Sequence, residues 1–285
     1  MATILATRDR LTTRTVYHSE LSNARLHKLP YSIRPFSTLN EKLSILHNTA
    51  PPVVEPSIGY FAIGIGGHGF TGTGDSATVV YYQHNPDDAV LFDQVPFILR
   101  TLDNDLSPAQ RLRYAMRKVI QIAGVSYIAY YLRRIDMSTA RYTTRARNIE
   151  NGVVSESEYS TTDKCQSPTR FSADNSTVNV TSGKFLVTTT RLSLDMTTDD
   201  VTELANVFQI IHGNLDKARV SEIAVCSGVD HQINVTSASG SFVFTDAVAV
   251  QVMSFLIEDR ALRFNTRGWA RDVDVGSNVP MLRTV

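Results

Sequence analysis

The sequence is poor in cysteine and carries no excess charge of either sign. Its two cysteines, Cys165 and Cys226, are too few for a disulfide framework and lack the local pairing of a zinc site, so we expect reduced thiols. Lys plus Arg and Asp plus Glu each number 28, and no whole-chain field therefore attracts nucleic acid or an anionic membrane. A chain of balanced charge associates readily with other proteins.

Long apolar runs and targeting signals are also scarce. The longest apolar stretch, residues 242–257, contains polar side chains such as Asp246 and Gln251 and is too short to cross a bilayer comfortably. Near the N-terminus, Arg8-Asp9-Arg10 interrupts any apolar core of a signal peptide. We therefore expect a protein that is not inserted in a membrane.

The composition, 42% hydrophobic and 20% charged, is typical of a globular protein with a sizeable core. Capped helical patterns and β-branched runs both occur, which predicts an α+β fold with a mixed or antiparallel sheet, a few short helices and extended termini. The expected parts are an N-terminal arm and short helix (1–57), an α+β core block (58–136), a polar linker or surface excursion (137–179), a second α+β block packing on the first (180–270) and a C-terminal tail (271–285).

A glycine-rich stretch, residues 64–74, follows a strand-like run at 58–63. It contains the spacing Gly64-x-Gly66-x-x-Gly69 of a dinucleotide fingerprint. That fingerprint needs its last glycine to open a helix, whereas residues 77–82 are β-branched and aromatic and predict another strand. The stretch is thus interpreted as a tip between two strands, without a bound cofactor. His68 in this tip either binds or titrates, or simply decorates the loop.

Four helices are predicted from capping signals. One begins at Thr38 with Glu41 in capping-box spacing, and another begins at Ser107 and carries Ala115 and Met116 on one side. The third runs over 199–212 and the fourth over 246–262, and a short helix is expected at 87–92. Strands are predicted at 184–194 and 222–226, and a hairpin over 119–132 turns at Gly124.

Known catalytic patterns do not fit the chain. The seven histidines never fall at i, i+4 spacing, so no zinc site is predicted, and neither a Gly-x-Ser-x-Gly elbow nor a Walker lysine occurs. Acidic pairs occur at Asp87-Asp88, Asp103 with Asp105, and Asp199-Asp200, where each is expected to stabilise the start of a helix. We assign no catalytic, cofactor-binding or metal-binding residue and expect no enzymatic activity.

One set of arginine and tyrosine side chains has the residue types that are enriched in protein interfaces. A solvated helix face and a nucleic-acid surface are the alternatives, and the neutral charge disfavours the second. The candidate interface residues are Arg100, Arg111, Arg113, Arg117, Tyr130, Tyr131, Arg133 and Arg134.

Several stretches together resemble uncharacterised virion structural proteins of bacteriophages with contractile tails. They are Ile63-Gly64-Ile65-Gly66-Gly67-His68, Gln83-His84-Asn85-Pro86-Asp87-Asp88-Ala89, Val95-Pro96-Phe97-Ile98-Leu99-Arg100, residues 105–114, residues 127–132 and residues 220–230. They cover about a third of the chain, and none is a catalytic signature.

The resemblance implies a non-enzymatic subunit of a ring in the baseplate or in the head-to-tail neck. Its partners would be copies of itself and other tail or neck proteins, and its location would be the virion, assembled in the host cytoplasm. Two alternatives remain open at this stage: a nucleotide-binding enzyme that uses the 64–74 loop, and a module whose polar region 137–179 recognises a glycan or receptor.

Overall fold

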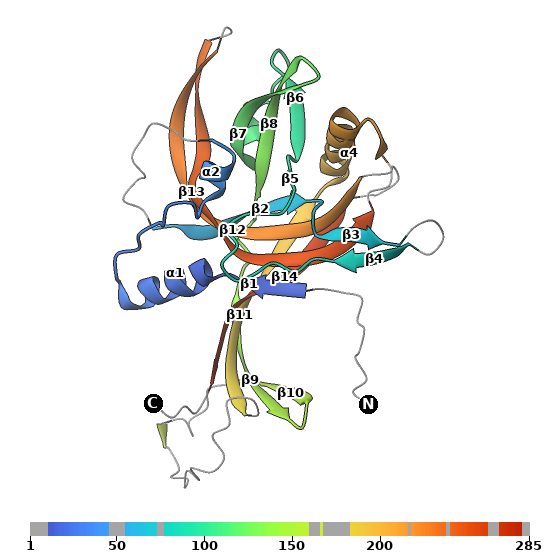
Figure 1. Cartoon of the computed structure of the whole chain (residues 1–285). Helices are drawn as coiled ribbons and strands as arrows, with labels where there is room; N and C mark the ends of the chain where they lie inside the picture. Colours follow the sequence, from blue (N-terminus) through green and yellow to red (C-terminus); the bar gives the residue numbers. More distant parts are fainter. Residues whose placement is uncertain are drawn as a thin grey trace. The chain divides into compact units, whose positions relative to one another are not determined.

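The computed structural model describes residues 11–45, 55–72, 77–159, 166–167, 183–215, 218–237, 240–261 and 268–280. Strands make up 54% and helices 17% of the structure, and the pairings are antiparallel (Figure 1). The prediction of antiparallel sheet with a few short helices is confirmed, although the fold is mainly β. The chain divides into two compact units, residues up to 135 with 195–270, called unit 1, and residues 136–194 with those after 270, called unit 2. The division after residue 270 coincides with an expected boundary and the division after 135 lies one residue from another, whereas residues 1–135 and 195–270 belong to one unit.

Unit 1 is built on an eight-stranded sheet. Its strands follow the order β1-β13-β12-β2-β8-β6, with β5 paired to β2 and β7 paired to β8. Their bounds are β1 Leu11–Arg14, β2 Ser57–Gly64, β5 Gln94–Val95, β6 Ile98–Thr101, β7 Tyr114–Ile122, β8 Val125–Arg134, β12 Arg219–Ser237 and β13 Gly240–Ala261. A separate two-stranded sheet pairs β3 (His68–Thr71) with β4 (Thr78–Tyr81).

The predicted helix over 246–262 is wrong, because these residues belong to strand β13. Most of β13 from Val250 to Ile257 is buried on both faces, and such a strand has a continuous apolar run that resembles a buried helix. Its polar side chains have internal partners. Gln251 donates to Ser37 Oγ at 2.8 Å and accepts a hydrogen bond from the Tyr31 hydroxyl at 2.7 Å.

The N-terminal segment is not an extended arm over the residues that the structure describes. Residues 11–14 form edge strand β1 on β13, and helix α1 (Val16–His27) follows directly. Thr15 caps this helix and also donates its hydroxyl to Val252 O at 2.6 Å. Tyr17 and Leu21 then pack against Met253. The prediction failed because the contacts that hold this segment lie some 240 residues further along the chain. Residues 1–10 lie outside the described part.

The capping signals located helix starts better than helix lengths. Thr38 and Glu41 form the predicted capping box, but helix α2 (Leu39–Lys42) is a single turn. Ser107 caps α3 (Pro108–Arg111), which is also a single turn. The predicted continuation through Met116 is wrong, because strand β7 begins at Tyr114. The expected helix over 87–92 is absent, and turns occupy that segment.

Two longer predictions are confirmed. Strands β7 and β8 form the hairpin predicted around Gly124, where Ala123 and Gly124 adopt φ of 49° and 81°. Helix α4 (Thr198–His212) has Thr197 as its N-cap, with Asp200 completing a capping box, and Gly213 ends it with φ of 66°. The apolar stripe of α4, which includes Leu204 and Phe208, is buried.

Unit 2 contains a four-stranded sheet in the order β10-β9-β11-β14. The bounds are β9 Tyr142–Glu150, β10 Val153–Glu158, β11 Lys184–Met196 and β14 Trp269–Pro280. The region 137–179, expected to be a polar linker or surface excursion, forms a hairpin over 142–158, where Asn151 and Gly152 make a tight turn with φ of 50° and 79°. The predicted strand at 184–194 is confirmed within β11. The C-terminal segment is also not a tail over 271–280, since Val273 and Val275 are buried in β14.

Candidate functional site

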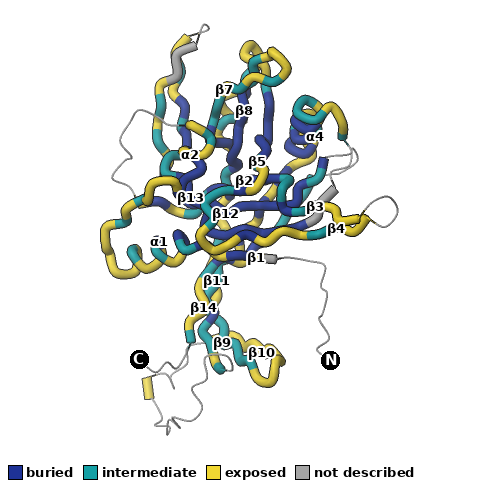
Figure 2. The backbone as a smooth tube through the Cα atoms, viewed as in Figure 1, coloured by how far each residue is buried: buried dark blue, intermediate teal, exposed yellow. Residues whose placement is uncertain are grey.

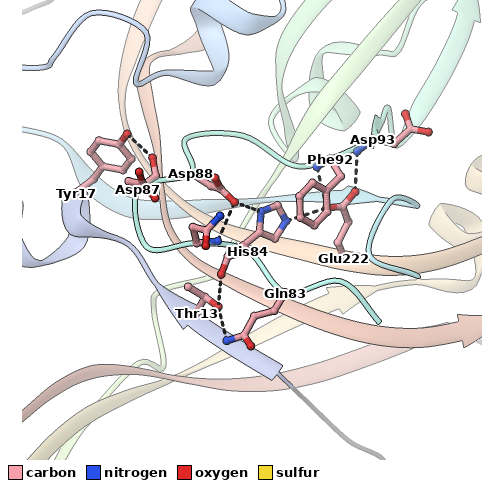
Figure 3. Close-up of polar contacts among 10 residues, drawn as sticks. Thr13, Tyr17, Gln83, His84, Asp87, Asp88, Phe92, Asp93 and Glu222 are labelled. Carbon is pink, nitrogen blue, oxygen red and sulfur yellow. Dashed lines mark hydrogen bonds and ion pairs between the residues drawn. The ribbon is translucent and has the colours of Figure 1, made fainter. Parts of the chain in front are cut away.

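A buried carboxylate, Glu222 of β12, lies at the centre of a polar cluster that joins segments far apart in the sequence. Its side chain is fully buried, and β12 places it opposite Gly64 of β2. Its Oε1 accepts hydrogen bonds from the backbone N–H of Gly66 and of Asp93, both at 2.9 Å. Figure 3 shows the contact with Asp93. Its Oε2 accepts from Phe92 N–H at 3.0 Å and lies 3.1 Å from His84 Nε2. The Glu222 side chain therefore joins the backbone at Gly66 and the backbone at residues 92–93 to its own strand, β12.

His84 connects this carboxylate to a second one. Its Nδ1 lies 3.0 Å from Asp88 Oδ2, which also accepts the Asn85 N–H at 2.9 Å. The imidazole is fully buried and stacked between the rings of Phe92 and Phe255, with centroid separations of 3.9 and 3.7 Å. We call His84, Asp88 and Glu222 the His84 clasp.

The glycines beside the clasp allow the backbone to approach Glu222 and its neighbours. A Cβ atom at Gly64 would lie 2.4 Å from Glu222 Oε1, and one at Gly67 would lie 2.5 Å from Ser221 O. After them the chain enters β3 at His68 rather than a helix. The predicted tip over 64–74 therefore contains a strand, and its residues 73 and 74 lie outside the described part. The N–H of Gly66, which a bound phosphate would need, already donates to a carboxylate. His68 itself lies edge-on to Phe70 at 5.8 Å.

The His84 clasp has the residue types of an acid-base site, but two of its three side chains are enclosed by the fold. The side chains of His84 and Glu222 are both fully buried, and backbone donors occupy the carboxylate. Its hydrogen bonds hold the turn at Gly66-Gly67, called the glycine turn, and the 83–93 loop on the sheet. Sequence reasoning missed it because His84 and Glu222 are 138 residues apart. The sequence feature that could have indicated this site is Glu222, an acidic residue directly before the apolar run Ile223-Ala224-Val225-Cys226.

A second buried cluster forms around Asp200 at the start of α4. Arg113 and Arg133 each lie 2.9 Å from Asp200 Oδ2, and the Tyr114 hydroxyl donates to Oδ1. Burial would raise the pKa of Asp200, but hydrogen bonds from Tyr114 and Thr197 and the charge of Arg133 outweigh it and lower this pKa. The predicted role of Asp199-Asp200 at a helix start is confirmed, whereas Asp87-Asp88 precedes no helix.

The other candidate interface residues also make contacts within the chain. Arg117 lies 3.2 Å from Asp105, which accepts the Tyr130 hydroxyl at 2.7 Å. Burial and this hydrogen bond raise the pKa of Tyr130. Further contacts pair Arg100 with Glu203, Arg134 with Asp230, and the Arg111 guanidinium with the ring of Phe242.

These placements separate the candidate set into two groups. Tyr130, Tyr131 and Arg133 are buried in unit 1, so a partner of the folded chain cannot reach them. Arg113 keeps 43% of its side chain exposed, and Arg111 is half-buried. An interface at the exposed members stays a prediction. Within the chain, Arg113 and Arg133 form ion pairs with Asp200, whereas Arg111 contacts the ring of Phe242.

The comparison with protein families gives one match, a family of unknown function, DUF7208, over residues 1–285. The chain belongs to this family. Because the match covers the whole chain, both units are part of what the DUF7208 family shares. No curated protein matches the chain, and no solved structure matches it.

In the described part of this DUF7208 member, no group of three or more His, Cys, Asp or Glu side chains is arranged to hold a metal ion. No described helix is long and apolar enough to cross a membrane. Cys226 is buried in β12, and burial raises the pKa of its thiol. Cys165 lies outside the described residues.

Proposed function

We propose that this DUF7208 member is a non-enzymatic structural subunit of a contractile-tailed phage virion and forms part of a ring in the baseplate or the head-to-tail neck. The resemblance of residues 63–68, 83–89 and 220–230 to virion structural proteins supports this proposal. These are also the segments that the His84 clasp ties together. The quoted residues therefore have a shared structural role that does not need a substrate.

The observation that carries the proposal is the edge strand β10. Among the described strands β10 pairs only with β9, and all six of its residues are exposed. Val153 and Val154 are apolar and 69% and 56% exposed. An exposed strand edge with apolar side chains is a template for pairing with another chain. A subunit that joins neighbours through its sheet needs such an edge.

The geometry of the hairpin shows which backbone groups of β10 face outward. In the tight turn at Asn151-Gly152, Glu150 and Val153 form the closing pair. Tyr159 N–H donates to Thr144 O at 3.2 Å, so odd-numbered residues bond to β9. The N–H groups of the even-numbered residues, beginning with Val154, point away from β9. These N–H groups do not bond to β9, so they can donate to a partner strand.

In this proposal, the partners are copies of the same chain together with other tail or neck proteins. Its place is the virion, after assembly in the host cytoplasm. The nucleotide-binding alternative is weakened by Glu222, whose side-chain oxygen already accepts the Gly66 N–H that a phosphate would have to bind.

The first experiment is mass spectrometry of purified virions from a phage that encodes this chain, combined with native mass spectrometry of the recombinant protein. We expect the chain in the particle and a ring-sized oligomer in solution. Absence of the chain from the particle would overturn the proposal. A strict monomer that is stabilised by a nucleotide in a thermal-shift screen would favour the enzyme instead.

A matched pair of variants then tests the edge strand. Val154→Pro removes an outward N–H and leaves the bonds between β10 and β9 in place, whereas Val154→Thr keeps the N–H. We expect the proline variant to lose the oligomer while its circular dichroism spectrum stays native, and the threonine variant to retain it. If the proline variant assembled normally, β10 would not be the contact, although the virion role would stand on the first experiment.

A further inference from the structure

The turn that joins β9 to β10 has a backbone conformation that few residue types adopt. Asn151 and Gly152 occupy it with φ of 50° and 79°, and Glu150 and Val153 form the pair that closes it. Asparagine and glycine are the residues that tolerate this left-handed region. The ladder bonds of a two-residue hairpin belong to its closing pair, so the amide nitrogen of Gly152 is not part of the ladder.

The same two residues are the reactive pair for loss of ammonia from an asparagine. The backbone nitrogen that follows an asparagine can attack the side-chain amide carbon, and a side chain on the following residue obstructs this approach. Among the asparagines of the sequence, only Asn151 precedes a glycine. Both residues of the turn are exposed. Apart from its chain neighbours, no described atom lies within 4 Å of the position that a Cβ at Gly152 would take, so water reaches the pair.

The hairpin offers little resistance to the opening that the attack requires. The five-membered ring of the product needs a backbone rotation at Asn151 that differs from the one in the closed turn, so the turn has to open first. All six residues of β10 are exposed, and no residue of β9 is buried. Local opening costs little free energy where few apolar contacts are buried. The attack therefore proceeds in the folded chain, although more slowly than in an unfolded peptide of the same sequence.

We propose that Asn151 is a site of spontaneous deamidation. In the first step, the Gly152 nitrogen forms a bond to the side-chain carbonyl carbon of Asn151 and loses its proton. The bond from that carbon to the side-chain nitrogen breaks, and ammonia leaves. Water then opens the five-membered imide at either carbonyl, which gives an aspartate or an isoaspartate at position 151. Water is the only co-reactant in both steps.

The isoaspartate product changes the hairpin more than the aspartate does. Its main chain passes through the former side chain and is longer by a methylene group, so the two-residue turn no longer fits the closing pair of Glu150 and Val153. Because turn type and loop length set the register of a hairpin, β10 loses its register on β9. A further consequence rests on the proposed function: a subunit with isoaspartate at this turn lacks the ordered β10 edge and joins its neighbours less well.

Tandem mass spectrometry of the full chain, incubated at neutral and mildly alkaline pH, tests the reaction because it locates the change within a peptide. We expect Asn151 to convert to the acid faster than Asn148, which lies in the same hairpin and is the matched control because it precedes Ile149. An enzyme that methylates isoaspartate should label the Asn151 product. Conversion of Asn151 no faster than that of Asn148 would overturn the proposal.

Hydrogen exchange separates the lengthened main chain from the added charge. The Ser155 and Ser157 amides, which bond to β9, should lose protection in the isoaspartate fraction of the aged protein. They should keep it in Asn151→Asp, which adds the charge without the methylene group. Equal protection in the isoaspartate fraction and the fresh protein would overturn the structural consequence. This readout is made on the hairpin itself, so it is independent of whether the chain assembles in a virion.

Discussion

The two units of the chain differ in how far their charged side chains are buried. Unit 1 buries charged side chains and surrounds them with partners, as at Glu222 and Asp200. In unit 2, β9 and β10 have no buried residue, and the buried apolar side chains lie on β11 and β14 (Figure 2). Burial makes the polar groups of unit 1 costly to change, whereas the exposed pairs of unit 2 are screened by water. Substitutions at buried and at exposed polar groups should therefore change the free energy of unfolding by different amounts.

The largest effect is expected at the centre of the His84 clasp. Glu222→Ala removes the acceptor for three backbone N–H groups and for His84, and should lower the free energy of unfolding by about 3–5 kcal/mol. Urea unfolding checks this value. Glu55→Ala, at an exposed acid paired with Arg25, is the matched control and should change the free energy by about 1 kcal/mol or less. If Glu222→Ala lowered the free energy of unfolding by no more than the control does, the buried polar groups of unit 1 would not be costlier to change than exposed ones.

The next effect is expected at Asp200. Asp200→Asn weakens the bonds to Arg133 and Tyr114 and should lower the free energy of unfolding by about 1.5–3 kcal/mol at neutral pH. Because the folded pKa of Asp200 is lowered, its contribution is present above the unfolded value of about 3.9 and is lost as the pH falls below it.

Unfolding of wild type and Asp200→Asn at neutral and acidic pH measures that difference, which should shrink on acidification. The exposed neighbour Asp199 provides the control, since Asp199→Asn alters the same helix turn without burying a group. If the difference in the free energy of unfolding instead grew at acidic pH, the lowered pKa of Asp200 in the folded state would be contradicted.

Unit 2 has one close backbone approach that can be tested by adding a methyl group. A Cβ at Gly276 of β14 would lie 1.9 Å from Thr188 O of β11, so Gly276→Ala should cost about 1–3 kcal/mol. Gly59→Ala is the control, because a Cβ there meets nothing within 4 Å. Hydrogen exchange should show lost protection in β11 and β14 and normal protection in β12. Equal losses in β12 would mean that the units do not respond separately.

The smallest effect is expected at the exposed ion pair between Arg147 and Glu156, whose atoms are 2.6 Å apart on β9 and β10. Arg147→Ala should change the free energy of unfolding by about 0.2–1 kcal/mol, and added salt should reduce the difference. A double-mutant cycle with Glu156→Ala isolates the pair. A coupling as large as that expected around Asp200 would show that this surface is less solvated than its exposure indicates.

Local signals predicted a useful part of the fold. The α4 helix was found because Thr197, Asp200 and Gly213 act within a few residues of one another, and the β7–β8 hairpin was found from Gly124. The Asn151-Gly152 turn was equally local and was overlooked. The helix length failed at α3, since a capping box specifies where a helix begins and tertiary packing decides how far it continues.

The candidate site was much harder to predict. The strand after the glycine stretch was predicted correctly, because the β-branched and aromatic residues at 77–82 form β4. The true neighbour of the glycine stretch, Glu222, could not be found by spacing, and the arginines of the candidate interface proved to be paired inside the chain.

The sequence by itself determined the turns, the caps and the neutral, cysteine-poor character of this protein, because those properties depend on neighbouring residues or on composition. Only the tertiary structure decided that 246–261 is a strand, that the N-terminal segment joins the sheet, and that His84 lies between Asp88 and Glu222. Those outcomes depend on burial and on hydrogen bonds between residues far apart in the chain, which no local pattern records.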